Sequence, residues 1–290
     1  MDIDHVAHFV PDIAAASAAL ERLGFTLTPF SAQSHRLTPG GPPVPAGTGN
    51  RCVMLEAGYL EFLTPTGATP IADQLRAAIA RYVGVHLLAF GTGAPEADHA
   101  RLAAAGFEPL APVALQRPIS TEDGEGIARF TVVRVAPGTM AEGRIQFCQH
   151  HTPDLVWQKR WLAHRNAASE LAAVVVCVAD PREAAQRYSR FTGVACTGKG
   201  GEWHMETARG SVIFTDAGTL SRTLGVEPPA LPWIAGYVLD TGDIGRTREA
   251  LDAAGFETKD AGERLSVVLP RELGGVIIFQ QPQTGALQLH

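Results

Sequence analysis

Four segments of the chain repeat one pattern, and this repeat constrains the fold more than any other feature. Each segment begins with an apolar run of strand length and continues as a stretch whose apolar residues recur at helical spacing. Three of the four segments then close on Gly-Phe, which ends the helix. The repeat predicts four copies of one supersecondary unit, which begin at the segments 5–25, 86–107, 171–193 and 234–256.

Each predicted helix is followed by about 25 to 40 residues that carry hairpin signals and end in a short strand. These last strands lie at residues 59–65, 144–150, 211–217 and 276–282. The length fits three further strands, so each unit is predicted to be βαβββ and the fold class to be α+β. Residues 31–50 are rich in Pro and Gly and are predicted to form a long loop over one face, with His35 in a lid.

A polar and aromatic stretch at residues 151–167 separates the second unit from the third. We therefore predict two domains, each made of a pair of modules. The first covers residues 1–150, the stretch 151–167 is a linker, and the second domain covers residues 168–290.

Composition excludes several classes of partner. The 290 residues are 46% hydrophobic and carry a formal net charge of −6 without a dense Lys/Arg cluster, which argues against nucleic acid and anionic membranes. The apolar runs are only strand-sized and the N-terminus does not resemble a signal peptide, so we expect a cytoplasmic protein. The four cysteines are far apart and are expected to be reduced packing residues.

Two histidines lie three residues apart in the first predicted strand, within DHVAHFVPD. Side chains alternate between the two faces of a strand, so His5 and His8 point to opposite sides of the sheet. They cannot contribute to one site, and the rest of the chain must show which of them has a chemical role.

In these repeats, almost the whole chain resembles the vicinal oxygen chelate superfamily. Within that superfamily it is most similar to the glyoxalase-like domain proteins, which are related to glyoxalases, bleomycin resistance proteins and dioxygenases. The resemblance implies that paired βαβββ modules form curved, cup-like mixed sheets. It also implies a divalent metal ion in the cup, with ligands from the first and last strands of each module. A small-molecule substrate and a homodimer are the partners we expect.

Carried over by position, the resemblance places the first-strand ligands at His5 and His86 and the last-strand ligands at Glu61 and Gln146. Two imidazoles, a carboxylate and an amide oxygen suit a divalent ion such as Zn, Ni, Mn or Fe. The neutral amide of Gln146 predicts weak binding, since most metal-using members carry Glu there. His8 is predicted to be structural. The GTGN segment has Gly49 where related proteins often have His.

The equivalent positions of the third and fourth modules carry only apolar side chains. First-strand ligands would fall near Ala173 and Ala235, and last-strand ligands near Ile213 and Ile278. A cup lined by these residues cannot hold a hard cation, so the C-terminal pair is predicted to be a scaffold or an apolar pocket.

Other residues are predicted to act on the substrate. Glu61 and His150 are candidates for moving a proton, and Tyr59 is the best hydroxyl donor because it shares a strand face with Glu61. Candidates for binding the substrate, with the arginines taking an anionic group, are Arg51, Arg144 and Phe9.

The leading functional hypothesis is a metal-dependent enzyme of the glyoxalase-like class that stabilises an enolate or oxyanion, as a lyase, isomerase or hydrolase. The alternative is a metal-free protein that sequesters a hydrophobic small molecule. An extradiol-type dioxygenase is disfavoured, because the C-terminal module pair, where that class holds its iron, lacks ligands.

Overall fold

The computed structural model describes residues 1–36, 41–260, 263–282 and 289, and within them it forms the four expected units in order. The first unit consists of β1 (Asp2–Phe9), α1 (Ile13–Arg22), β2 (Ser31–Arg36), β3 (Pro43–Met54) and β4 (Tyr59–Pro65). The second consists of β5 (Gly84–Gly91), α3 (Pro95–Ala104), β6 (Val113–Thr121), β7 (Gly124–Arg134) and β8 (Arg144–His150).

The C-terminal half repeats this order twice. The third unit consists of β9 (Ala168–Cys177), α5 (Pro181–Thr192), β10 (Cys196–Lys199), β11 (Glu202–Glu206) and β12 (Ser211–Thr215). The fourth consists of β13 (Trp233–Thr241), α7 (Ile244–Ala253), β14 (Thr258–Asp260), β15 (Arg264–Val268) and β16 (Val276–Gln280). Further helices connect the units: α2 (Pro70–Arg81), α4 (Pro153–Val156), η1 (Lys159–Trp161) and α6 (Ala217–Leu224).

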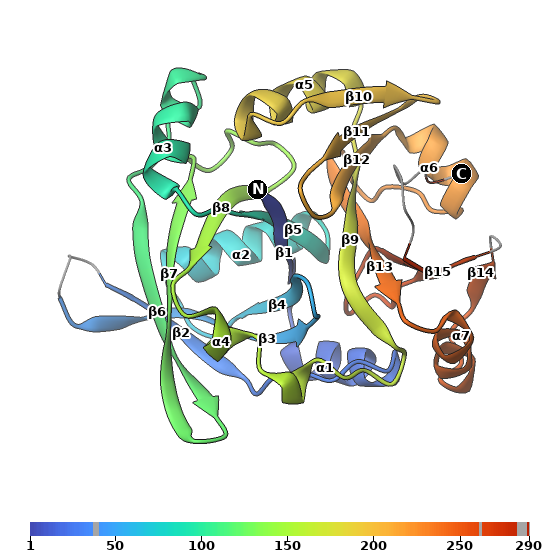
Figure 1. Ribbon diagram of the computed structural model, residues 1–290, viewed down its shortest axis with the longest axis horizontal. Coiled ribbons are helices and arrows are strands. Elements are labelled where there is room, and N and C mark those ends of the chain that lie inside the picture. Colours follow the sequence, from blue (N-terminus) through green and yellow to red (C-terminus); the bar gives the residue numbers. More distant parts are fainter. Residues whose placement is uncertain (37–40, 261–262, 283–288, 290) are drawn as a thin grey trace.

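The strand pairing follows the modular pattern and confirms the α+β fold of four βαβββ units. In every unit the first strand pairs in parallel with the last, as β1 does with β4 and β5 with β8. The first strands then pair antiparallel across each pair of units, β1 with β5 and β9 with β13. A link between β5 and β13 joins the halves into one curved sheet, with the N-terminal half at the left of Figure 1. The domain boundaries at 151–167 stay a prediction.

Residues 31–50 differ from the expectation of a long loop. Ser31–Arg36 and Pro43–Met54 form the antiparallel strands β2 and β3, and residues 37–40 lie outside the described part of the chain. The turn-forming Pro and Gly residues hid the strands. Pro43 and Pro45 are tolerated because they lie at the start of β3, where it pairs only with the edge strand β2 and not yet with β4.

Local signals explain how each unit makes its helix. Asp12 caps α1 by accepting hydrogen bonds from the backbone of Ala14 and Ala15, and Asp180 caps α5 in the same way. Gly193 then ends α5 in the left-handed conformation, at a φ of 77°. The helices pack on the sheet face opposite the cups and bury a core that includes Leu20, Leu102, Tyr188, Phe191 and Phe214.

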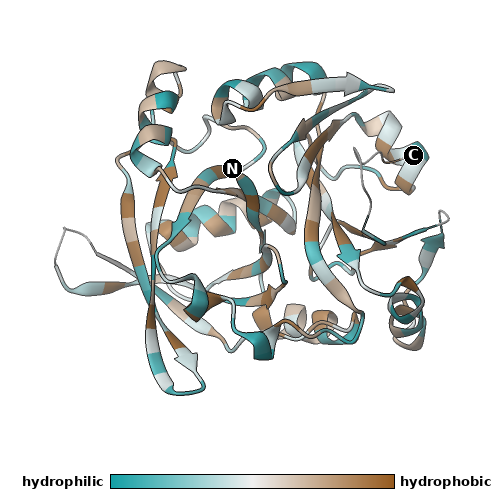
Figure 2. Cartoon of the chain, viewed as in Figure 1, coloured by the Kyte–Doolittle hydropathy of each residue, from teal (hydrophilic) through white to brown (hydrophobic). Residues whose placement is uncertain are grey.

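The strands β6 and β7 form a long hairpin, and the residues of β6 alternate between half-buried and exposed. Figure 2 shows hydrophobic and hydrophilic stretches that follow one another along the hairpin. One face of the hairpin therefore lies over the N-terminal cup while the other faces solvent. None of the described helices combines the length and the apolar character that crossing a membrane requires.

Candidate functional site

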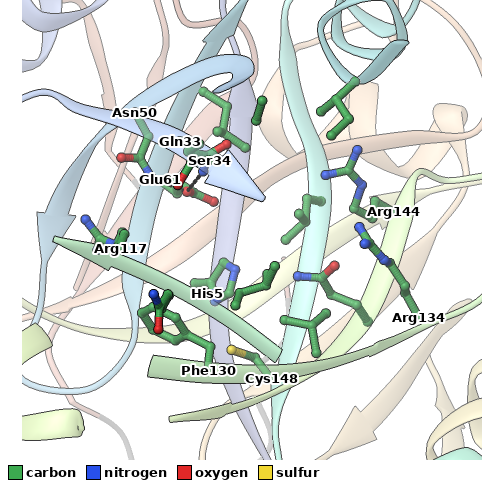
Figure 3. Close-up of a pocket in the computed structure, with 18 of the residues that line it drawn as sticks. His5, Gln33, Ser34, Asn50, Glu61, Arg117, Phe130, Arg134, Arg144 and Cys148 are labelled. Atoms are coloured by element: carbon green, nitrogen blue, oxygen red, sulfur yellow. Dashed lines mark hydrogen bonds between the residues drawn. The ribbon is translucent and has the colours of Figure 1, made fainter. Parts of the chain in front are cut away.

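A cavity of about 190 Å³ lies in the N-terminal cup. The central strands β1, β4, β5 and β8 form its floor, while β2, β3, β6 and β7 contribute its walls. Its polar and ionisable lining residues are His5, Gln33, Ser34, Asn50, Tyr59, Glu61, Gln116, Arg117, Arg134, Arg144, Gln146 and Cys148. Figure 3 shows Glu61 near Asn50 and Gln33, while Arg134 and Arg144 lie together on another side of the cavity.

Strand register determines which side chains reach this cavity. Glu61 pairs with Ala7 in the first unit, and Gln146 pairs with Ala89 in the second, so Glu61 and Gln146 occupy equivalent positions. By the same register, the residue equivalent to His5 is Leu87, which also lines the cavity. Three of the four predicted ligand side chains, His5, Glu61 and Gln146, are thus brought to one cavity.

His86 does not line this cavity. The pairing of β1 with β5 contains a bulge, in which Leu87 pairs with Ala7 and Val85 with His8, so His86 is the extra residue. Its Nε2 lies 2.8 Å from the carbonyl oxygen of Tyr82, and burial lowers its pKa to about 4. The structure therefore gives His86 a packing role and puts a leucine where the sequence pattern suggested an imidazole.

Asp4 is the extra residue of the equivalent bulge in β1, which turns its carboxylate toward His5. Asp4 Oδ2 lies 2.5 Å from His5 Nδ1, and His150 Nε2 lies 3.1 Å from the same carboxylate. Burial raises the pKa of Asp4, but the hydrogen bonds from His150 and His5 outweigh it and hold this pKa well below its usual value. A charged Asp4 accepts the Nδ1 proton of His5, which leaves Nε2 as the ring nitrogen that Asp4 does not hold.

Asp4 also belongs to a compact set of ligand-type side chains with Cys148 and His150. Their nearest donor atoms all lie within 4.8 Å of one another, and the Cys148 Sγ is 3.7 Å from His150 Nε2. Burial, with the charges of Asp4 and Glu61 adding, raises the pKa of the Cys148 thiol well above its usual value. His150 lies behind the cavity wall, bonded to Asp4 and packed edge-on against Tyr59 and other rings.

Glu61 is held by two amides that the sequence pattern did not single out. Asn50 Nδ2 donates a short hydrogen bond to Glu61 Oε1, and Gln33 Nε2 donates to the same oxygen at 3.4 Å. Thr48 in turn donates to the Gln33 Oε1 at 2.7 Å, which fixes that amide. Asn50 directly follows Gly49, so the GTGN segment was the one sequence signal near this contact.

Three arginines give the cavity an excess of positive charge over the single carboxylate of Glu61. Arg117, Arg134 and Arg144 make no ion pair with any residue in the described part of the chain. Burial, together with the charge of Arg134, lowers the pKa of Arg144 to about 10, so it stays protonated at neutral pH. Arg134 Nε is buried and lacks a hydrogen-bond partner among the described atoms. Such groups are suited to an anionic ligand.

The remaining predicted residues lie at different distances from the cavity. Tyr59 lines it and stacks on His5, with ring centroids 4.4 Å apart, and burial raises its pKa well above the usual value, so its hydroxyl stays protonated. Phe9 packs beneath the Arg144 guanidinium, whose Cζ lies 5.8 Å from the centroid of the Phe9 ring. Arg51 is turned away from the cavity, because its Nε donates to the carbonyl oxygen of Thr28.

His8 lies on the sheet face opposite the cup, as strand alternation predicts. It is fully buried, with Nδ1 2.9 Å from the carbonyl oxygen of Leu273 and Nε2 3.2 Å from the hydroxyl of Tyr237. Both partners come from the fourth unit. His8 therefore contributes to packing between the two halves of the chain.

Strand register in the C-terminal half places Ala173 and Gly236 at the positions equivalent to His5, and Ile213 and Ile278 at those equivalent to Glu61 and Gln146. Ala235, where the sequence pattern put a ligand position, is the extra residue of a bulge, as His86 is in the second unit. Ala173, Ala235, Ile213 and Ile278 are all buried in one cluster. Helix α6 contributes further members of this cluster, including Leu220. The four equivalent positions therefore offer no ligand to a cation.

Comparisons with known structures agree with this architecture. A hypothetical protein from Staphylococcus aureus is 12% identical, with a TM-score of 0.65, over 97% of this chain and 99% of its own. A mutant of 4-hydroxymandelate synthase from Streptomyces coelicolor is 15% identical, with a TM-score of 0.59, over 98% of this chain and 94% of its own. The Mn(II)-bound glyoxalase from Novosphingobium aromaticivorans is 11% identical, with a TM-score of 0.55, over 97% of this chain and 81% of its own.

No curated protein matches the sequence. The family model described as a glyoxalase-like domain matches residues 3–192, which is more than half of the chain. The match covers the first two modules together with β9 and α5 of the third, and it confirms the resemblance to the vicinal oxygen chelate superfamily. The chain therefore belongs to the glyoxalase-like domain family.

Proposed function

We propose that this protein is an enzyme that acts on a small anionic organic molecule in the N-terminal cavity with the help of a divalent metal ion. One observation carries the proposal: His5, Glu61 and Gln146 line the same cavity as three arginines that have no acidic partner among the described residues. This combination joins metal-ligating groups to a positively charged binding surface.

The donor set of the cavity fits a divalent ion. His5 offers Nε2, because its Nδ1 proton is bonded to Asp4, and a histidine ligand held by a carboxylate is a frequent arrangement in metal sites. Both amide contacts of Glu61 reach Oε1, which leaves Oε2 for a ligand. Gln146 adds an amide oxygen from the equivalent strand position. With Leu87 in the fourth position, the set is weaker than two imidazoles and two carboxylates would be.

An ion held by His5, Glu61 and Gln146 would act as a Lewis acid that stabilises negative charge on a substrate oxygen. The residues around it have separate tasks. Arg134 and Arg144 bind the anionic group and orient the molecule, while the neutral hydroxyl of Tyr59 donates a hydrogen bond to a substrate oxygen. Glu61 is the carboxylate placed to take or return a proton, and Asp4 keeps His5 in one tautomer.

His150 takes a supporting part in this proposal. It bonds to Asp4 behind the cavity wall, so it shares a hydrogen-bond network with His5. In this arrangement His150 supports Asp4, and other residues contact the substrate directly. His86 and Arg51 have no part, since each is bonded to a backbone carbonyl outside the cavity.

The amount of divalent metal that the purified protein binds tests the proposal directly. In equilibrium dialysis the purified protein is expected to bind about one equivalent of Mn²⁺ at saturation, and His5→Ala and Glu61→Gln are each expected to weaken binding by at least about tenfold. His151→Ala is the matched control, because that imidazole is exposed and bonds Thr131 outside the cavity. Retention of the ion in His5→Ala with loss in His150→Ala would instead assign it to Asp4, Cys148 and His150.

A metal-free binding protein is the second candidate, and Leu87 in place of a histidine is the observation that favours it. If the folded protein binds carboxylates but no divalent ion at any concentration tested, this candidate takes first place. A dioxygenase that uses the C-terminal module pair is not supported, because Ala173 and its equivalents are apolar. A cytoplasmic location and a homodimer stay predictions.

A further inference from the structure

A second cavity, of about 270 Å³, lies beside the first. The segment that enters β2, the β6–β7 hairpin and the short helices α4 and η1 form its walls. Its lining is predominantly apolar and includes Phe30, Met54, Ile119, Val156 and Trp161. Phe30 is 46% exposed, which is unusual for a large aromatic side chain in this protein.

The two cavities follow each other along the same two strands. On β2, Gln33 and Ser34 line the first cavity, while Ser31 and Ala32 line the second. Along β6, residues 115–117 line the first cavity and residues 117–120 line the second. The cavities therefore lie end to end between β2 and β6.

Arg117 is the residue that both cavities share. It makes no ion pair or hydrogen bond with any residue the structure describes, and its guanidinium lies 6.0 Å from the ring centroid of Phe130. The side chain can turn without breaking a polar contact, because none holds it in place. Arg117 therefore stands at the boundary between the two cavities.

Size supports treating the cavities as parts of one binding site. Pockets that hold small organic ligands usually measure about 300–1,000 Å³. Each cavity by itself is smaller than this range, at about 190 and 270 Å³, whereas the two together fall within it. Phe30, whose ring is 46% exposed, and Trp161 supply apolar surface to the second cavity that a ligand in the first cavity alone would not reach.

We propose that the ligand of this protein is an amphipathic carboxylic acid that spans both cavities. Its carboxylate lies against Arg134 and Arg144 in the first cavity, and its apolar or aromatic tail passes Arg117 to pack against Phe30, Ile119 and Trp161. The inference rests on the proposed function for the position of the carboxylate, and it adds the tail as the feature that determines specificity.

Chain length is the variable that tests this inference. Calorimetric titration with acetate, butyrate, hexanoate and octanoate is expected to show affinity rising by about fourfold for each methylene that enters the apolar cavity. Ile119→Trp fills that cavity and is expected to abolish most of the rise in affinity from butyrate to octanoate. Ile127→Trp is the matched control, since Ile127 is 43% exposed on the same hairpin and lines neither cavity.

The outcomes separate this inference from the function on which it rests. If acetate and butyrate bind through Arg144 but longer acids bind no tighter, the two-cavity ligand is wrong and the proposed function stands. The inference is equally overturned if Ile119→Trp leaves the chain-length dependence intact. If the folded protein binds none of the acids, both the inference and the anionic substrate of the proposed function fail.

Discussion

Lowering the pH from 7 to 4.5 is expected to cost the protein about 2.5 kcal/mol of unfolding free energy through His8 alone. Burial lowers the pKa of His8 from 6.5 to about 4, and the hydrogen bond to the carbonyl oxygen of Leu273 offsets only part of that effect. The unfolded chain binds a proton near pH 6.5, whereas the folded chain resists it until about pH 4. The folded state is therefore favoured by the neutral His8 above pH 6.5, and this contribution to the unfolding free energy is lost as the pH falls toward 4.

Urea unfolding at constant ionic strength, at pH 7 and pH 4.5, measures this loss. His8→Gln is expected to be less stable than the parent at pH 7, because it loses the stacking on Phe62 and changes the bonds to Leu273 and Tyr237. Between the two pH values, however, the variant is expected to lose about 2.5 kcal/mol less than the parent does. His151→Ala, which removes an exposed imidazole, is expected to follow the parent. Parallel losses in His8→Gln and the parent would refute the reasoning.

Three further changes test other parts of the structure. Arg144→Gln removes a buried cation of the cavity and is expected to weaken butyrate binding by about tenfold in calorimetry, whereas Arg76→Gln, on the exposed side of α2, changes nothing. Asp4→Asn removes the charge that fixes His5, so Mn²⁺ affinity measured by equilibrium dialysis is expected to fall by about 10- to 100-fold, and an unchanged affinity would contradict the supporting role of Asp4. Arg187→Met leaves the fully buried Glu142 without its partner and is expected to cost about 3–5 kcal/mol in urea unfolding, with the Glu142→Gln/Arg187→Met double variant recovering part of the loss.

The modular fold could be predicted from the sequence because the repeat is a local signal. An apolar strand, a helix with an Asp cap and a closing Gly-Phe recur in positions that survive changes in loop length. Residues 31–50 were harder, because turn-forming Pro and Gly residues occur there in β3, the neighbour of the edge strand β2, and in the sequence between the two strands. Strand membership in that segment depends on pairing with β4, which is a tertiary contact.

The candidate site could be predicted only where strand alternation holds. Alternation places His5 and Glu61 correctly on the cavity side and His8 on the other. It fails at the bulges in the pairing of β1 with β5, where one extra residue shifts the register, so that His86 corresponds to Asp4 and Leu87 to His5. A bulge is set by the partner strand, and a single sequence does not reveal it.

The arginines show a second limit of the sequence. Arg51 and Arg144 both lie in strands beside cavity residues, yet only Arg144 reaches the cavity, because Arg51 follows Asn50 and points to the other face. Arg117 and Arg134 come from the β6–β7 hairpin, which folds over the cup from a distance along the chain. Their role depends on that long-range packing.

The position of a bound metal ion is the most direct test of the central claim. Anomalous scattering from a crystal grown with saturating Mn²⁺ is expected to show one strong peak in the N-terminal cavity, at direct bonding distance from His5 Nε2 and a Glu61 carboxylate oxygen and within reach of the Gln146 amide oxygen. A peak held by Asp4, Cys148 and His150 instead, or no peak in the cavity of a crystal that contains the ion in its solvent, would contradict it.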